Sequence, residues 1–410
     1  MQNTHPATAK RQRDPRLDFY RGIAMFIILA AHTPGNFFTS WIPARWGFSD
    51  ATEIFVFCSG MASAIAFGTS YELRGWFIGT ARVAYRVWQV YWAHICMFLV
   101  IAMLVAWWDQ IGFSEKNYVN SLNLAPFFTG RTGSSTGIET VTADNLIGLM
   151  TLTYVPNYFD VLPMYIVILC LMPLMMALAQ VHVALAFALS VFIWFFAQSR
   201  ILEALGITAI DLHFNAEPWS NREWFFNPFG WQLIFFTGFA FVRGWLPRPP
   251  INVWFVLLAL VIVIGNIPFS NIGSRYDMLQ DVNGWRTENR IWITKSDFGI
   301  LRYVHFLGFA YLGYAIAGDG GHRLLPQGRR GLSWLWKWTV TLITKVGQQS
   351  LAVFIFSMVL GRISGMLLDQ TERTTAVVVS ANFIGWALLI CVAYTVAWFK
   401  SNPWKRPAAV

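Results

Sequence analysis

Long apolar stretches that recur along the whole chain constrain its fold more than any other feature. Ten of them have the length, roughly 17 to 25 residues, that an α-helix needs to cross a bilayer. They lie at residues 17–35, 51–69, 85–107, 161–180, 182–199, 225–243, 251–267, 298–318, 347–365 and 376–399. Hydrophobic residues make up 56% of the chain and charged residues 12%, which excludes an ordinary soluble enzyme. We therefore predict an all-α, polytopic membrane protein with about ten transmembrane helices.

No part of the sequence is typical of a soluble domain. We predict a basic tail over 1–16, a single transmembrane domain over 17–399 and a second tail over 400–410. Residues 1–16 lack the small-residue cleavage site of a signal peptide, so we expect the first helix to be retained. The four cysteines lie in apolar stretches and have the spacing of neither a metal site nor a disulfide framework, so we expect no bound metal.

The net charge of +9 is distributed unevenly along the chain. Lys and Arg collect at both ends and in alternate connections between the apolar stretches, including the loop 322–337. Because cytoplasmic loops are enriched in Lys and Arg, we predict that these regions face the cytoplasm and that both termini are inside. The positive charge is then a topology signal, and we expect no nucleic-acid partner.

The first apolar stretch carries two ionisable residues, Arg21 and His32, with ten residues between them. Eleven positions at 100° per residue return to within about 20° of the starting direction, so one helix face carries both side chains. Asp18 falls on that face too. Asp18 and Arg21 lie near a helix end, where such side chains commonly reach the headgroups. His32 has no such explanation, and an ionisable residue at membrane depth indicates a functional site.

Several other polar residues are predicted at the same depth as His32, toward the outer side. They are Glu53 in the second stretch, Asp160 and Tyr165 at the fourth, Asn227 and Gln232 in the sixth, Arg302 and His305 in the eighth, and Arg362 in the ninth. Convergent polar groups at one depth favour a polar cavity between helices over scattered interfacial anchors. The three-residue spacing of Arg302 and His305 suits either a shared ligand or pairing with a neighbouring acid.

An imidazole in such a cavity can take a proton from an attacking hydroxyl when a carboxylate orients its other nitrogen. Glu53 is the first candidate for that carboxylate, because only a short connection separates the outer ends of the first two stretches; Asp160 is the alternative. A rival interpretation is a secondary transporter or channel, in which the intramembrane His, Arg and acids form a proton or anion pathway.

Segments spread over nearly the whole chain resemble a known family. RLDFYRGIAMFIILAAHTPGN, DATEIFVFCSGMASAIAFG and LRYVHFLGFAYL are similar to the OpgC group of membrane acyltransferases, which is related to the acyltransferase-3 superfamily. The resemblance implies that an Arg followed after ten residues by His, here Arg21 and His32, is the functional motif of the first helix. It also implies a succinyltransferase of the bacterial inner membrane that has ten helices and both ends inside.

The implied donor is cytoplasmic succinyl-coenzyme A, with no tightly bound cofactor, and the implied acceptor is an osmoregulated periplasmic glucan. Arg82, Arg86 and the loop 322–337 would then offer positive charge to the phosphates of the donor, aided by Arg21. His32 would deprotonate the glucan hydroxyl, in a direct transfer or by way of an acyl-histidine.

A succinyl group has a free carboxylate, which a guanidinium binds well. By predicted depth, Arg302 or Arg362 is the nearest candidate for this contact. The transferred group could also be acetyl, because the sequence does not place either arginine in the cavity.

Overall fold

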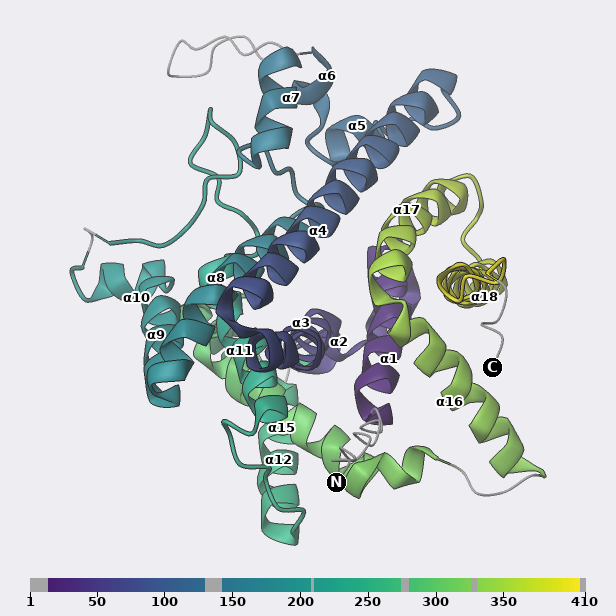
Figure 1. Ribbon diagram of the computed structural model, residues 1–410. Helices are drawn as coiled ribbons and strands as arrows, with labels where there is room; N and C mark the ends of the chain where they lie inside the picture. Colours follow the sequence, from purple (N-terminus) through teal and green to yellow (C-terminus); the bar gives the residue numbers. More distant parts are fainter. Residues whose placement is uncertain (1–13, 130–141, 208–209, 274–279, 326–329, 406–410) are drawn as a thin grey trace.

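The computed structural model describes residues 14–129, 142–207, 210–273, 280–325 and 330–405 (Figure 1). Within these residues the regular structure is helical, apart from an isolated β-bridge between Asn215 and Glu223. The predicted all-α class is therefore confirmed for this part of the chain. Most of the predicted N-terminal tail, residues 1–13, and the end of the C-terminal tail, residues 406–410, lie outside it.

Each of the ten predicted stretches overlaps a helix. The helices concerned are α1 (Pro15–His32), α3 (Ala51–Ser63), α4 (Thr69–Ile111), α8 (Val161–Val181), α9 (Val183–Phe196), α11 (Pro228–Arg243), α12 (Val253–Gly265), α15 (Ile300–Ala317), α17 (Ser350–Asp369) and α18 (Thr375–Lys400). Shorter elements connect them: η1 (Phe37–Ser40), α2 (Pro43–Trp46), η2 (Ala64–Gly68), α5 (Tyr118–Ser121), α6 (Ala125–Thr129), α7 (Thr142–Thr151), α10 (Ser199–Ala204), η3 (Ile267–Phe269), α13 (Gln280–Glu288), α14 (Arg290–Ile293) and η6 (Asp319–Leu324).

Five helical stretches of the described residues are long and apolar enough to cross a membrane. They are Ala51–Ile111, Val161–Val181, Ile300–Ala317, Ser350–Asp369 and Thr375–Lys400. The first joins α3, η2 and α4 and is interrupted at Gly75, whose φ of 78° is non-helical. The helices α9 and α12, with 14 and 13 residues, are shorter than a typical span. The chain thus has the helices of a membrane protein, while the count of ten spans stays a prediction.

A helix that the sequence analysis did not predict follows η6. Part of α16 (Leu332–Gln348) covers the range 322–337, which was assigned to a basic cytoplasmic loop. It carries Lys337 and the exposed side chains of Trp334 and Trp338. The apolar residues of α16 are separated by Lys and Thr, so no uninterrupted apolar run marks it as a span.

Close helix crossings at glycines hold α1 and α3 in place. A Cβ at Gly22 of α1 would lie 2.0 Å from the carbonyl oxygen of Ile343 in α16, and one at Gly347 would lie 1.8 Å from that of Asp18. Likewise, a Cβ at Gly60 of α3 would lie 1.9 Å from the carbonyl oxygen of Phe235 in α11. Small residues let membrane helices approach closely. As a result α1 lies against α3, α16 and α17 (Figure 1).

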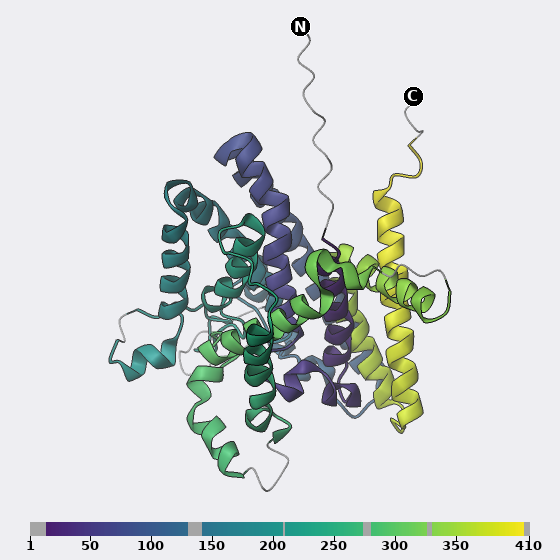
Figure 2. The same cartoon turned by 90° about the horizontal axis from the view of Figure 1, so that it is seen from below.

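The two ends of the described chain lie on the same side of the molecule. In Figure 2 the beginning of α1 and the end of α18 both point toward the top of the view. Lys400, the last residue of α18, donates a hydrogen bond of 2.7 Å to Gln349, next to the crossing of α1 and α16. This arrangement is compatible with both termini being cytoplasmic, and that orientation stays a prediction.

Candidate active site

A cavity of about 290 Å³ opens beside the end of α1. It is lined by side chains of α1, α3, α8 and α17 and of the loops that precede α8, α11 and α15. The polar residues that line it are His32, Thr52, Asn157, Tyr158, Asp160 and Lys295. A concave, mostly apolar site with a few polar groups is the usual form of a ligand-binding pocket. His32 is therefore placed where the sequence analysis expected it, in a cavity between helices.

The imidazole of His32 is oriented by its own helix. Its Nδ1 lies 2.8 Å from the carbonyl oxygen of Ile28. Because a carbonyl can only accept a hydrogen bond, we assign the proton to Nδ1. In the neutral ring Nε2 then keeps its lone pair. A general base uses such a lone pair to accept a proton.

Glu53 does not orient His32, so that part of the prediction is wrong. The Glu53 carboxylate is fully buried, and its Oε1 accepts hydrogen bonds of 2.8 and 2.5 Å from Nε and Nη2 of Arg302. Its Oε2 accepts a 2.8 Å hydrogen bond from the backbone N–H of Asp50, which forms a capping box at the start of α3. A buried arginine needs such a partner, so Glu53 joins α3 to α15.

Arg302 and His305 share a face of α15 but do not share a ligand in this structure. Arg302 pairs with Glu53, whereas Nδ1 of His305 accepts a hydrogen bond of 3.3 Å from the backbone N–H of Ser49 and lies 2.7 Å from its hydroxyl. Both residues thus hold the segment that leads into α3. Of the two readings of their spacing, the structure favours pairing with neighbouring groups.

Lys295 was missed by the sequence analysis, although it lines the cavity. Its ammonium forms an ion pair with Asp50 and lies 5.5 Å from the ring centre of Phe226. Burial opposes ionisation of Asp50, but the charges of Lys295 and Arg302 hold the pKa of this carboxyl below its usual range. The only signal in the sequence was a lysine close to the start of the eighth apolar stretch, in a loop already rich in polar residues.

Asp160 is the carboxyl group that shares the cavity with His32. It precedes α8, and its Oδ1 accepts a 3.0 Å hydrogen bond from the backbone N–H of Phe225. Burial raises the pKa of Asp160 to about 7, and the hydrogen bond from Phe225 only partly opposes this shift. Asp160 thus lies in the cavity as predicted, without a hydrogen bond to His32.

Tyr158 connects His32 to Arg362. The Tyr158 ring makes an edge contact with the imidazole at 5.3 Å between ring centres, and the guanidinium carbon of Arg362 lies 3.8 Å from the centre of the same ring. The Tyr158 hydroxyl donates a 2.6 Å hydrogen bond to the carbonyl oxygen of Met358, one turn before Arg362 in α17. Arg362 was a predicted site residue but does not itself line the cavity, whereas Tyr158 lines it and was not predicted.

The other polar residues of α1 lie away from the cavity wall. The Arg21 guanidinium donates a hydrogen bond to Ser350 at the start of α17. Asp18 is buried where α1 crosses α16, beside Gly347. Arg21 and His32 are separated by roughly 16 Å along the helix, from the rise of 1.5 Å per residue. The structure therefore places Arg21 far from His32, at the start of α17.

Three further predicted residues also do not line the cavity. Asn227 caps α11 and donates a 2.8 Å hydrogen bond to Leu212. Gln232 donates a 2.7 Å hydrogen bond to the carbonyl oxygen of Ser190, between α11 and α9. Tyr165 packs against an aromatic side chain of α11. Asn227 and Gln232 are thus hydrogen-bonded to the backbone, which is the usual state of buried polar groups.

A second cavity, of about 320 Å³, lies at the interrupted start of α4. It is lined by Arg74, Arg82, Ser70 and three other residues, and Arg82 donates a 2.6 Å hydrogen bond to the Ser70 hydroxyl. Arg86, the other predicted donor-binding residue, is half-buried, does not line this cavity and donates a 3.1 Å hydrogen bond to Gln89.

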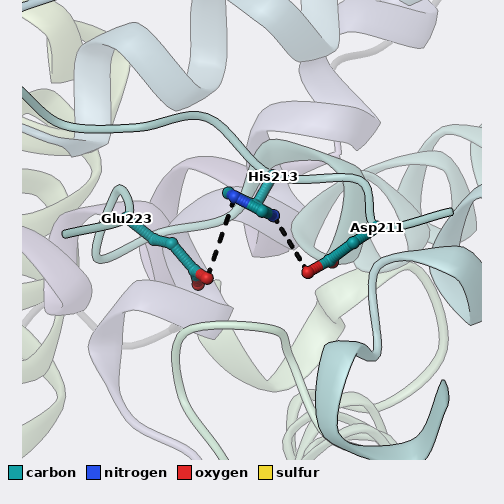
Figure 3. A group of neighbouring side chains, drawn as sticks. All are labelled: Asp211, His213 and Glu223. Atoms are coloured by element: carbon teal, nitrogen blue, oxygen red, sulfur yellow. Dashed lines mark ion pairs between the residues drawn. The ribbon is translucent and has the colours of Figure 1, made fainter. Parts of the chain in front are cut away.

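A group of three ionisable side chains lies outside both cavities (Figure 3). The His213 ring lies between two carboxylates, with Nδ1 3.1 Å from Asp211 and Nε2 3.9 Å from Glu223. A metal ion binds one ring nitrogen, whereas here each carboxylate faces a different one. We therefore interpret the group as ion pairs on a solvent-facing loop.

The two cavities and the first-helix motif all lie within the range of one family. The family described as OpgC protein matches residues 13–401, nearly the whole chain. This chain belongs to the OpgC family. Membership covers α1 through α18, so His32, Asp160 and Arg362 are all part of the OpgC domain. No curated protein matches the chain, and no solved structure matches it.

Proposed function

We propose that this OpgC-family protein is a transmembrane O-acyltransferase of the bacterial inner membrane. It transfers a succinyl group from cytoplasmic succinyl-coenzyme A to a hydroxyl of a periplasmic, osmoregulated glucan. The family is associated with acyl transfer to glucans. The observation that carries the proposal is the Nε2 atom of His32, left free to accept a proton because Nδ1 is held by Ile28.

His32 acts as the general base in this reaction. The glucan hydroxyl donates its proton to Nε2 while its oxygen attacks the thioester carbonyl. The coenzyme A sulfur leaves as the thiolate, takes the proton back from Nε2, and a glucan ester is formed. The positive charge that develops on the ring is stabilised by the Ile28 carbonyl.

A route through an acyl-histidine uses the same nitrogen atom. Nε2 would attack the thioester first, and the glucan hydroxyl would then attack the acyl-imidazole. The two routes differ in one observable: only the second leaves labelled acyl group on the protein when glucan is omitted.

In this proposal the donor approaches from the cytoplasmic side of the membrane, opposite to the glucan. Arg74 and Arg82 bring positive charge to the second cavity, and phosphate oxygens accept hydrogen bonds from guanidinium groups. Arg21, which donates a hydrogen bond to Ser350, adds a positive charge nearer the beginning of α1 than His32.

The test measures transfer of label from [¹⁴C]succinyl-coenzyme A to glucan by purified protein in liposomes. His32→Gln should lower the rate by about 100-fold or more, the usual contribution of a general base. His182→Asn is the matched control, because His182 is exposed at the start of α9 and lines neither cavity, and Asn keeps an N-cap acceptor; it should leave the rate unchanged.

Two results would contradict the proposal. Transfer at the wild-type rate by a folded His32→Gln variant would remove His32 from the chemistry. An inactive wild type that instead carries succinate or protons across the liposome membrane would favour a transporter.

A further inference from the structure

Tyr158 holds an uncommon backbone conformation beside the base. Its φ is 92°, in a region that residues with a side chain seldom occupy. Such strain persists only where surrounding contacts enforce it, and it concentrates at functional sites. Here the enforcing contacts are the hydrogen bond to Met358 and the packing of the ring against His32 and Arg362.

Arg362 differs from the other cations near the cavity. Lys295 is paired with Asp50, and Arg302 is paired with Glu53. Among the described residues, no carboxylate pairs with Arg362, and its Nε is buried without a hydrogen-bond partner. A buried donor without a partner is costly, so a ligand oxygen at this position would be bound favourably.

The contact of Arg362 with the Tyr158 ring leaves the guanidinium able to bind a carboxylate. An arginine that lies over an aromatic face keeps its N–H groups directed outward in its own plane, where they match the two oxygens of a carboxylate. Tyr158 thus fixes the position of the guanidinium, while Nε of Arg362 has no hydrogen-bond partner.

We propose that Arg362, positioned by Tyr158, binds a carboxylate at the end of the acyl chain that is transferred. This inference rests on the proposed acyl transfer and identifies the group that selects the donor. His32 and Arg362 contact the same ring, at 5.3 and 3.8 Å from its centre, so they are closer together than the sum of these distances. Two methylenes separate the carboxylate of a succinyl group from its thioester carbonyl, a length suited to this gap.

The packing of the backbone also places Arg362 at the same depth as His32. A Cβ at Gly361, the preceding residue, would lie 3.0 Å from the carbonyl oxygen of His32. The helices α1 and α17 therefore approach each other closely at the base itself. Of the two arginines that the sequence analysis considered for the carboxylate, the contacts select Arg362 over Arg302.

The experiment compares succinyl-coenzyme A with butyryl-coenzyme A, in which a methyl group replaces the carboxylate. The wild type should prefer succinyl. Arg362→Met should lower kcat/KM for succinyl-coenzyme A by about 10- to 100-fold, the usual effect of losing a charged hydrogen bond, and leave butyryl transfer unchanged. Equal losses with both donors, or an unchanged preference in a folded variant, would overturn the proposal.

Tyr158 variants test the positioning role. Tyr158→Phe keeps the ring and should retain the preference for succinyl. Tyr158→Leu removes the ring, and it should reduce the preference mainly through KM for succinyl-coenzyme A. Arg362→Lys, which keeps the charge but loses the planar fork, should restore part of the preference lost in Arg362→Met. If Tyr158→Leu keeps the full preference, Tyr158 does not position Arg362.

A binding measurement separates this proposal from the transfer reaction. If the wild type transfers neither acyl group, the proposed function fails, and the thermal shift caused by free succinate is measured instead. Stabilisation of the wild type, but not of Arg362→Met, would support the carboxylate site. Equal stabilisation of both proteins, or none of either, would overturn it.

Discussion

The buried carboxylate of Glu53 and the guanidinium of Arg302 form an ion pair with hydrogen bonds of 2.8 and 2.5 Å, which joins the start of α3 to α15. Neither residue of the pair lines the cavity beside His32, which is formed by other side chains. Glu53 therefore supports the architecture around His32, and we expect it to take no part in the proposed proton transfer.

Replacing Glu53 by Gln should destabilise the protein more than it slows the chemistry. Removing one partner of a buried ion pair leaves an uncompensated charge and costs about 3–5 kcal/mol. The free energy of unfolding in mixed micelles measures this loss. The double variant Glu53→Gln/Arg302→Met removes both charges and should recover much of the stability. A stable Glu53→Gln protein with abolished turnover would instead assign Glu53 to the reaction.

This ion pair also shows where the sequence stops being informative. The apolar stretches predicted the helices, since length and composition decide whether a segment can be a membrane span. They could not predict that α3 lies against α15, because partner choice depends on packing at residues far apart in the chain. Glu53 and Arg302 are 249 positions apart, and the sequence offered His32 as an equally reasonable neighbour for Glu53.

The site was predicted in part for the same reason. His32, Asp160 and Arg362 stood out as ionisable groups at apolar stretches, where desolvation demands an explanation. Lys295 and Tyr158 lie in loops, where polar and aromatic residues are common. Only the fold shows that these two loops close the cavity beside the end of α1.

The raised pKa of Asp160 predicts a dependence of stability on pH. Burial raises this pKa from 3.8 to about 7, so the folded protein binds the proton more tightly than the unfolded chain does. The stabilisation of the folded state by protonated Asp160 is fully present below about pH 4 and is lost as the pH rises toward 7. Its size is about 1.4 kcal/mol for each unit by which the pKa is raised. Asp160→Asn keeps a neutral group and an acceptor for the Phe225 N–H.

The measurement is the melting temperature in detergent between pH 4 and pH 8. The wild type should lose stability relative to Asp160→Asn across this range, and the variant should be the more stable protein at pH 8. Parallel curves for the two proteins would mean that Asp160 does not change its protonation in this window.

Gly347→Ala should weaken the crossing of α1 and α16. The new Cβ would lie 1.8 Å from the backbone oxygen of Asp18, which cannot move aside without shifting the helix. Overpacking of this kind costs about 1–3 kcal/mol. Gly265→Ala is the matched control, since nothing lies within 4 Å of the added methyl group, and its effect should stay within about 1 kcal/mol. Equal melting temperatures for the two variants would contradict the close crossing.

Arg82 and Arg86 give the sharpest test of the donor site, because the structure separates two residues that the sequence treated alike. Arg82 lines the second cavity and donates a hydrogen bond to Ser70, whereas Arg86 lies outside this cavity and donates one to Gln89. Arg82→Gln should raise KM for succinyl-coenzyme A by about tenfold, as expected when one charged hydrogen bond is lost, and leave KM for glucan unchanged. Arg86→Gln should change neither KM by more than about twofold, because Arg86 does not line the cavity and bonds only to Gln89. The comparison is made at fixed ionic strength with saturating glucan. If both variants raise KM for the donor equally, the phosphates bind along the exposed face of α4 and not in this cavity.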